Sequence, residues 1–271
     1  MTTTTTSADG TTIAYDVSGT GPALIIVDGA MCYREMGPSK DLAAALSDRF
    51  TVYRYDRRGR GESTMGKEPT PGTNEAVEQE VADLAAVIEA AGGHGHLLGQ
   101  SSGAALALEA AREGLPIDSI VAYEAPFILD DTREPNDADL GERTAKLAKS
   151  GKRAAAVELF LRTVGMPWPA VKVMRLTPAF KKLTPVAHTL AYDFSIVLPF
   201  QQGMPLPGGY YKNVKVPVLS AAGSKSPTYM TNAQQAIAKA VPDGRYVVLD
   251  GQNHMVKASA LAPVAAEFFT A

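Results

Sequence analysis

Short apolar runs that favour β-strands alternate along this chain with longer alanine-rich segments of helical period. This alternation predicts an α/β fold, in which a mainly parallel central sheet is flanked by helices on both faces. Strands are expected at 11–17, 23–27, 51–55, 96–98, 119–123, 216–221 and 245–249, and helices at 39–47, 74–91, 102–113, 231–240 and 258–269. We expect 11–17 at the sheet edge and the continuously apolar run 23–27 in its centre.

The alternation is interrupted between Pro126 and the strand expected at 216–221. Residues 130–139 are acidic and polar, 140–164 has helical period, and seven prolines follow up to Pro207. We therefore expect an α/β core made of 1–129 and 208–271, with 130–207 inserted as a helical cap. The threonine run near the N-terminus is interpreted as a low-complexity tract.

The composition is that of a globular protein. Of the 271 residues, 45% are hydrophobic and 20% are charged, and a chain of this length can bury a sizeable core without a metal or a disulfide. Cys32 is the single cysteine, and the net charge of −3 argues against nucleic-acid binding. The chain shows neither a signal peptide nor a run of about 18 apolar residues. We expect a cytoplasmic protein that does not bind a membrane.

A pentapeptide of the form G-x-S-x-G stands between the strand at 96–98 and the helix at 102–113. It reads Gly99-Gln100-Ser101-Ser102-Gly103. Glycines at both ends permit a sharp strand-to-helix turn that exposes the central serine, and the helix N-terminus beside it favours negative charge. The pattern predicts Ser101 as a nucleophile, with the N–H of Ser102 stabilising an oxyanion. The alternative is a turn that only links strand to helix.

With this turn in place, the chain resembles the small, cofactor-free serine hydrolases of the α/β-hydrolase fold, which are esterase-like enzymes. The resemblance extends from Thr11 to Phe269 and is weakest in the cap. It includes the loop from Tyr55 to Ser63, YDRRGRGES, in which the family uses the Asp and Arg residues to hold loops together. The resemblance implies a helical cap inserted after the sixth strand. It favours a scaffolding role over phosphate binding for the basic cluster Arg54, Arg57, Arg58 and Arg60.

A serine nucleophile needs a base, and the chain has four histidines. His94 and His96 are expected at the far end of the strand that leads to Ser101, and His188 lies in the cap. His254 follows the last expected strand, in the loop where the family places its base. We expect His254 to be the base.

The third member of such a triad is an acid that orients the base. The family usually has an acid in a Gly-x-x-Asp sequence after the strand at 216–221, where this chain has a serine, Ser226. Some members carry the acid after the preceding strand, and Glu124 occupies that position here. Glu124 is therefore the expected acid, Asp250 is the weaker alternative, and a purely structural carboxylate at position 124 is a further one.

The second oxyanion donor is expected in the loop after 23–27, which reads Asp28-Gly29-Ala30-Met31. Gly29 permits close approach of the backbone to a substrate, and Ala30 should supply the N–H, with Met31 as the alternative. Asp28 stands where the family often has histidine. It either hydrogen-bonds the loop or changes the substrate preference.

Large apolar side chains of the cap are candidates for a substrate pocket, although each could equally belong to the cap's own core. We expect Trp168 and Phe194 to line the pocket together with Asp28 and Met31. These expectations favour a hydrolase that cleaves an ester, lactone or related acyl compound through an acyl-enzyme, without metal or cofactor. Its substrate would be small and partly apolar, and the protein a monomer or homodimer.

Two alternatives remain open at this level. One is a non-hydrolytic enzyme on the same fold, which would cleave carbon–carbon bonds or catalyse a lyase reaction or a rearrangement. The other is a ligand-binding protein without catalysis.

Overall fold

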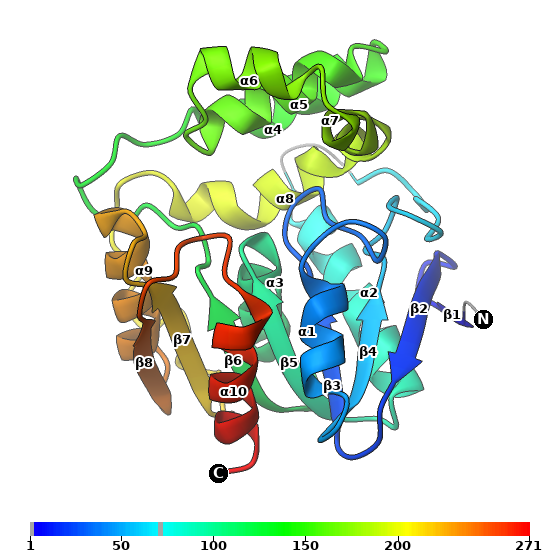
Figure 1. The fold of residues 1–271 in the computed structure, drawn as a ribbon, viewed down its shortest axis with the longest axis vertical. Helices are drawn as coiled ribbons and strands as arrows, with labels where there is room; N and C mark the ends of the chain where they lie inside the picture. Colours follow the sequence, from blue (N-terminus) through cyan, green and yellow to red (C-terminus); the bar gives the residue numbers. More distant parts are fainter. Residues whose placement is uncertain (1–2, 70–72) are drawn as a thin grey trace.

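The computed structural model describes residues 3–69 and 73–271. Within these residues, eight strands form one sheet in the order β1-β2-β4-β3-β5-β6-β7-β8 (Figure 1). The strands are β1 (Thr3–Thr6), β2 (Thr12–Ser18), β3 (Ala23–Val27), β4 (Thr51–Tyr55), β5 (Gly95–Gln100), β6 (Ile117–Tyr123), β7 (Val218–Gly223) and β8 (Gly244–Leu249). All neighbours from β4 to β8 pair in parallel, whereas the pairs β1–β2 and β2–β4 are antiparallel. The predicted α/β fold with a mainly parallel sheet is confirmed.

Helices cover both faces of the sheet. In chain order, the helices of the described residues are α1 (Ser39–Leu46), α2 (Glu75–Ala90), α3 (Ser102–Arg112), α4 (Leu140–Lys149), α5 (Arg153–Thr163), α6 (Trp168–Met174), α7 (Pro178–Leu183), α8 (Leu190–Val197), α9 (Thr228–Ala240) and α10 (Ala258–Phe269), with 3-10 helices η1 (Thr184–Thr189) and η2 (Leu198–Phe200). The faces of the sheet are covered by α1, α2, α3, α9 and α10. None of the helices in the described ranges is both long and apolar enough to cross a membrane.

The central strands carry a core on each face because successive side chains of a strand point to opposite sides. In β3, Leu24 and Ile26 pack in the cluster formed with α1 and α10, whereas Ile25 and Val27 pack in the cluster formed with α2, α3 and α9. This double burial explains the continuous apolar run of β3. Because β3 to β8 pair in parallel, the carboxyl ends of these strands share one edge of the sheet.

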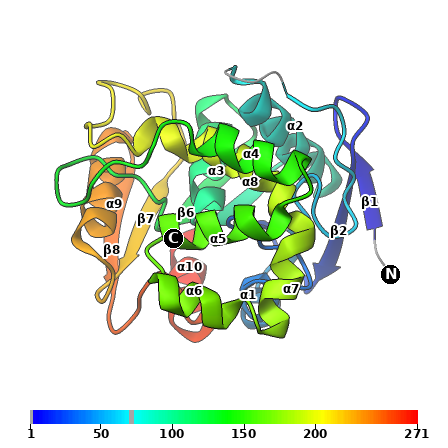
Figure 2. The same ribbon diagram turned by 90° about the horizontal axis from the view of Figure 1, so that it is seen from above.

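The segment between β6 and β7 holds α4 to α8 and lies over that edge. Figure 1 shows α4 to α7 as an upper layer, with α8 between this layer and the core, and Figure 2 shows α4, α5 and α8 crossing above the strands. The helices therefore stand where the sequence predicted a cap, after the sixth strand. The proposed boundaries of that cap, 130 and 207, stay a prediction.

Two predictions about the elements were wrong. The strand expected at 11–17 is not at the edge, because the threonine run forms β1 and pairs with β2. Threonine is β-branched and favours extended backbone, so its repetition supports a strand rather than an unstructured tract. The helical segment expected at 140–164 is divided into α4 and α5 at Gly151, whose φ of +76° ends the first helix.

Candidate active site

Ser101 occupies a sharp turn between β5 and α3. Its φ of 54° and ψ of −126° are unusual for a residue with a side chain, and its N–H donates to the carbonyl of Tyr123 in β6 (2.9 Å). The turn requires the two flanking glycines: a Cβ at Gly99 would lie 2.6 Å from backbone atoms of the next helix, and one at Gly103 would lie 2.1 Å from the carbonyl oxygen of Val27. Such strain is typical of functional positions.

The loop after β3 passes directly over this turn. A Cβ added to Gly29 would lie 2.9 Å from Cβ and 3.6 Å from Oγ of Ser101. Ser102 is the first residue of α3, and the first N–H groups of a helix have no acceptor within the helix. The backbone around Ser101 can therefore present donors to a group bound at its hydroxyl.

A histidine and a buried carboxylate form a pair at the same edge of the sheet. Nδ1 of His254 lies 2.8 Å from Oε2 of Glu124. Glu124 is fully buried and has a φ of 49°, and its Oε1 accepts hydrogen bonds from the N–H of Gly223 (2.7 Å) and the hydroxyl of Ser226 (2.5 Å). The carboxylate of Asp250 instead accepts from Ser224 (3.1 Å).

Tyr123 links the turn at Ser101 to the loop that carries His254. Its carbonyl accepts from Ser101, and its hydroxyl donates to the carbonyl of Asn253 (2.7 Å). The structure thus brings Ser101, Glu124 and His254 to the carboxyl ends of β5, β6 and β8. Among the described residues, the hydroxyl of Ser101 makes no hydrogen bond to His254, whose side chain is 39% exposed.

The other histidines lie where the sequence placed them. Nδ1 of His94 is 2.9 Å from Asp118, and Nδ1 of His96 is 2.9 Å from the hydroxyl of Ser119. These contacts are at the amino ends of β5 and β6, opposite the turn. His188 in η1 lies 3.0 Å from the carbonyl of Pro185.

Asp28 and its neighbours form a largely buried loop. Ala30 is half-buried, and Met31 is buried with a φ of 66°. Oδ1 of Asp28 has no hydrogen-bond partner in the described part of the chain. Burial raises the pKa of Asp28 to about 6, although the charges of nearby arginines oppose the increase. Burial also raises the pKa of Cys32 to about 12, so this thiol stays protonated at neutral pH.

The predicted scaffolding role of the arginine cluster is confirmed by its ion pairs. Three of its guanidinium groups are buried and donate to buried carboxylates: Arg57 to Glu80 (2.6 Å), Arg58 to Asp83 (2.6 Å) and Arg60 to Asp193 (2.8 Å). The fourth, Arg54, pairs with the partly exposed Asp16 (3.1 Å). Sequence reasoning missed these acids. The signal for Asp193 was a single charge within the apolar helical sequence LAYDFSIV, since a charged residue is seldom fully buried unless it is paired.

The two cap residues expected in the pocket have different environments. Phe194 is buried, and its ring packs edge-on against Phe160 at 6.3 Å. Trp168 is 44% exposed, and its ring contacts the cationic groups of Arg162 (5.6 Å) and Lys172 (5.0 Å). Neither environment identifies a substrate pocket, and the assignment of both residues stays a prediction.

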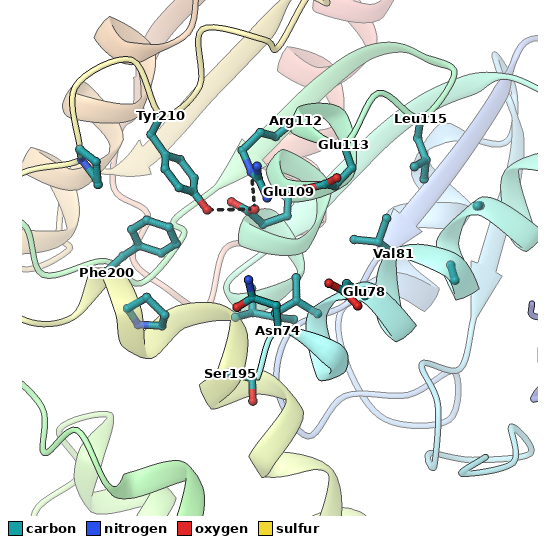
Figure 3. A pocket seen from close by; sticks show the side chains of 16 residues that line it. Asn74, Glu78, Val81, Glu109, Arg112, Glu113, Leu115, Ser195, Phe200 and Tyr210 are labelled. Atoms are coloured by element: carbon teal, nitrogen blue, oxygen red, sulfur yellow. Dashed lines mark hydrogen bonds and ion pairs between the residues drawn. The ribbon is translucent and has the colours of Figure 1, made fainter. Parts of the chain in front are cut away.

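A cavity of about 470 Å³ lies elsewhere, between α2, α3 and the segment that leaves the cap (Figure 3). Its lining includes Val81, Phe200 and Tyr210. Inside it, Oε2 of Glu109 accepts from Arg112 (2.8 Å) and from the hydroxyl of Tyr210 (3.1 Å). The expected catalytic residues Ser101, Glu124 and His254 do not line this cavity, nor do Trp168 and Phe194. Within residues 3–69 and 73–271, no cluster of three or more metal-ligating side chains is found.

The strand order and the sharp turn between β5 and α3 define the α/β-hydrolase class of folds. The Alpha/beta hydrolase family model matches residues 10–267, so the chain belongs to that family. A crystal structure of an α/β hydrolase from Sphaerobacter thermophilus is 39% identical, covers 98% of this chain and 100% of its own, and has a TM-score of 0.88.

More distant structures share the fold. An esterase from a Rhodococcus species is 18% identical over 100% of this chain and 98% of its own, with a TM-score of 0.68. The enol-lactonase from Burkholderia xenovorans is 19% identical over 97% of this chain and 98% of its own, with a TM-score of 0.65.

Proposed function

We propose that this protein is a serine hydrolase that cleaves an ester, lactone or related acyl compound through an acyl-enzyme. The observation that carries the proposal is the contact of 2.8 Å between His254 and the buried Glu124, at the edge of the sheet where Ser101 lies half-buried on its turn. A base must be held in one tautomer to take a proton from serine, and a carboxylate on Nδ1 leaves Nε2 free as the acceptor.

The residues have complementary roles in the proposed reaction. Oγ of Ser101 attacks the acyl carbon while Nε2 of His254 accepts its proton, and the N–H groups of Ser102 and Ala30 stabilise the oxyanion. Collapse of the tetrahedral intermediate expels the alcohol group, which takes the proton from His254. A water molecule then attacks the acyl-enzyme with the same base, releasing the acid and restoring Ser101.

Two structural relatives support the acyl class of substrate. One is described as an esterase and the other as an enol-lactonase, so the fold is compatible with action on esters and lactones. We expect substrate identity to depend on the cap, because the function of a protein lies in the site built on its fold. We propose a small, partly apolar acyl compound.

The test uses a fluorophosphonate probe and short p-nitrophenyl esters. We expect covalent labelling of wild-type protein at Ser101 and ester turnover, both lost in Ser101→Ala and reduced by orders of magnitude in His254→Ala. His94→Ala is the matched control, because His94 is bonded to Asp118 at the opposite end of the sheet. A folded wild-type protein that neither reacts with the probe nor turns over esters or lactones would refute the proposal and favour ligand binding.

A further inference from the structure

The carboxylate of Asp193, in cap helix α8, is buried among groups of the core. Its Oδ1 accepts hydrogen bonds from the hydroxyl of Ser102 (2.7 Å) and from Nη1 of Arg57 (2.9 Å). Its Oδ2 accepts from Nη2 of Arg60 (2.8 Å). One side chain from the cap therefore joins the residue that follows Ser101 to two arginines of the loop after β4.

The same two arginines hold the loop after β3 by its carbonyl groups. Nη1 of Arg57 donates to the carbonyl of Asp28 (3.2 Å), and Nη1 of Arg60 donates to the carbonyls of Gly29 (2.8 Å) and Cys32 (3.2 Å). These bonds orient successive peptide groups of the loop. Both elements that contribute donors to the proposed oxyanion hole are thus connected to one buried carboxylate.

The bond to Gly29 has a direct consequence for Ala30. The carbonyl of Gly29 and the N–H of Ala30 belong to one planar, trans peptide group, in which C=O and N–H point in opposite directions. This carbonyl is held by Arg60 (2.8 Å) and, more weakly, by the N–H of Cys32 (3.3 Å), so Arg60 contributes to where the N–H of Ala30 points. On the other side, Asp193 holds the hydroxyl of Ser102 and so restrains the first residue of α3.

We propose that Asp193 is a positioning residue that aligns the two oxyanion donors, Ser102 and Ala30, and makes their alignment depend on the seating of cap helix α8. This inference rests on the proposed function. Asp193 acts through Ser102 and Arg60, and it does not itself contact the reacting atoms.

The charges explain why this carboxylate is needed. Burial by itself would raise the pKa of Asp193, but the charges of Arg60 and Arg57 hold it below its ordinary value. Arg57 has a second carboxylate partner in Glu80. In the described ranges, Arg60 forms its ion pair with Asp193 alone. Without Asp193, the buried Arg60 loses its counter-charge, which is costly and favours a shifted guanidinium.

The simpler role for Asp193 is to fasten the cap without affecting catalysis. Another contact between cap and core provides a control for this role: Nδ2 of Asn232 in α9 donates to Oδ2 of Asp130 (2.7 Å). Neither of these residues is bonded to the loops around Ser101. The variant Asn232→Ala removes a fastening contact and leaves the oxyanion donors in place.

The experiment compares two inhibitors of the same shape. Oγ of Ser101 adds to the carbonyl carbon of a trifluoromethyl ketone, and the resulting negative oxygen occupies the oxyanion hole. The corresponding alcohol binds without forming an anion. In Asp193→Asn we expect the inhibition constant of the ketone to rise about 10- to 100-fold, in parallel with the loss in kcat, because displacing an oxyanion donor has effects of this order. The inhibition constant of the alcohol should change less than about threefold, and Asn232→Ala should affect neither inhibitor.

The variant Ser102→Ala keeps the test decisive if Asp193→Asn fails to fold. It removes the hydroxyl bonded to Asp193 but retains the backbone N–H, and we expect a rise of about 3- to 10-fold for the ketone only. Equal weakening of both inhibitors, or no change in either, would overturn the inference. Failure of the proposed function has a different signature, because the wild-type protein would then form no adduct with the ketone.

Discussion

The hydroxyl of Ser226 donates a hydrogen bond of 2.5 Å to Glu124, whose other carboxylate oxygen faces His254. Ser226 stands at the position where proteins of this fold usually have the acid. In the proposed site the acid is Glu124, at the end of β6, and the residue at the usual position donates a hydrogen bond to it. Glu124 is fully buried, and its Oε1 accepts hydrogen bonds from both the N–H of Gly223 and the hydroxyl of Ser226.

Removing this support should weaken the site without abolishing it. Ser226→Ala deletes a hydrogen bond to a charged group, which contributes about 1.5–3 kcal/mol in proteins. We expect a lower free energy of unfolding in urea and a decrease in kcat of about tenfold, because Glu124 retains the N–H of Gly223 and His254. Unchanged values of both quantities would show that Ser226 does not support the carboxylate.

The identity of the acid can be tested with two isosteric variants. Glu124→Gln removes the negative charge and allows an amide N–H to face His254, which favours the wrong tautomer of the imidazole. We expect kcat to fall by about 10³- to 10⁴-fold. Asp250→Asn is the matched control and should have little effect, since Asp250 is bonded to Ser224. The opposite pattern of kcat values would move the role to Asp250.

The turn at Ser101 should be intolerant of a methyl group at position 103. A Cβ there would lie 2.1 Å from the carbonyl of Val27 and 2.6 Å from that of Asp28, so backbone must move. We expect Gly103→Ala to lower the free energy of unfolding by about 3 kcal/mol or more. Gly208→Ala, where a Cβ meets nothing within 4 Å, should stay within about 0.5 kcal/mol of wild type. The measurement is thermal unfolding of both variants. Equal losses of stability in Gly103→Ala and Gly208→Ala would contradict the packing argument.

Asp28 should make stability depend on pH. Its pKa is raised from 3.8 to about 6 in the folded protein, so between these values the folded state holds a proton that the unfolded state has lost. The free energy of unfolding therefore falls as the pH rises through this window, by about 3 kcal/mol in total.

Asp28→Asn removes this ionisation. We measure the free energy of unfolding of both proteins by urea denaturation at several pH values. The difference, variant minus wild type, should be more positive at pH 8 than at pH 4 by up to about 3 kcal/mol. A difference between the two proteins that does not change with pH would exclude an elevated pKa for Asp28.

Several elements were predictable because their signals are local. The bounds of β3, β4 and α10 agree with those expected from the sequence, since apolar runs bounded by turn residues and a helical repeat need no distant partner. The turn at Ser101 was predictable for the same reason. The pairing of β1 with β2 was missed because β-pairing depends on a partner strand, and the preference of threonine for it is weak by itself.

The chain by itself determined the class of fold and the residue types that can carry its chemistry, because periodicity and turn glycines act over a few neighbouring residues. Glu124 was expected beside His254 only from the resemblance to a family, not from its neighbours in the chain. Tertiary structure decided how the other buried charges meet: the sequence offers 29 acidic residues, and nothing local identifies Asp193 as the partner of Arg60, 133 positions away. Such pairs form where the folded backbone brings buried charges together, since a buried charge is stable only beside its counterpart.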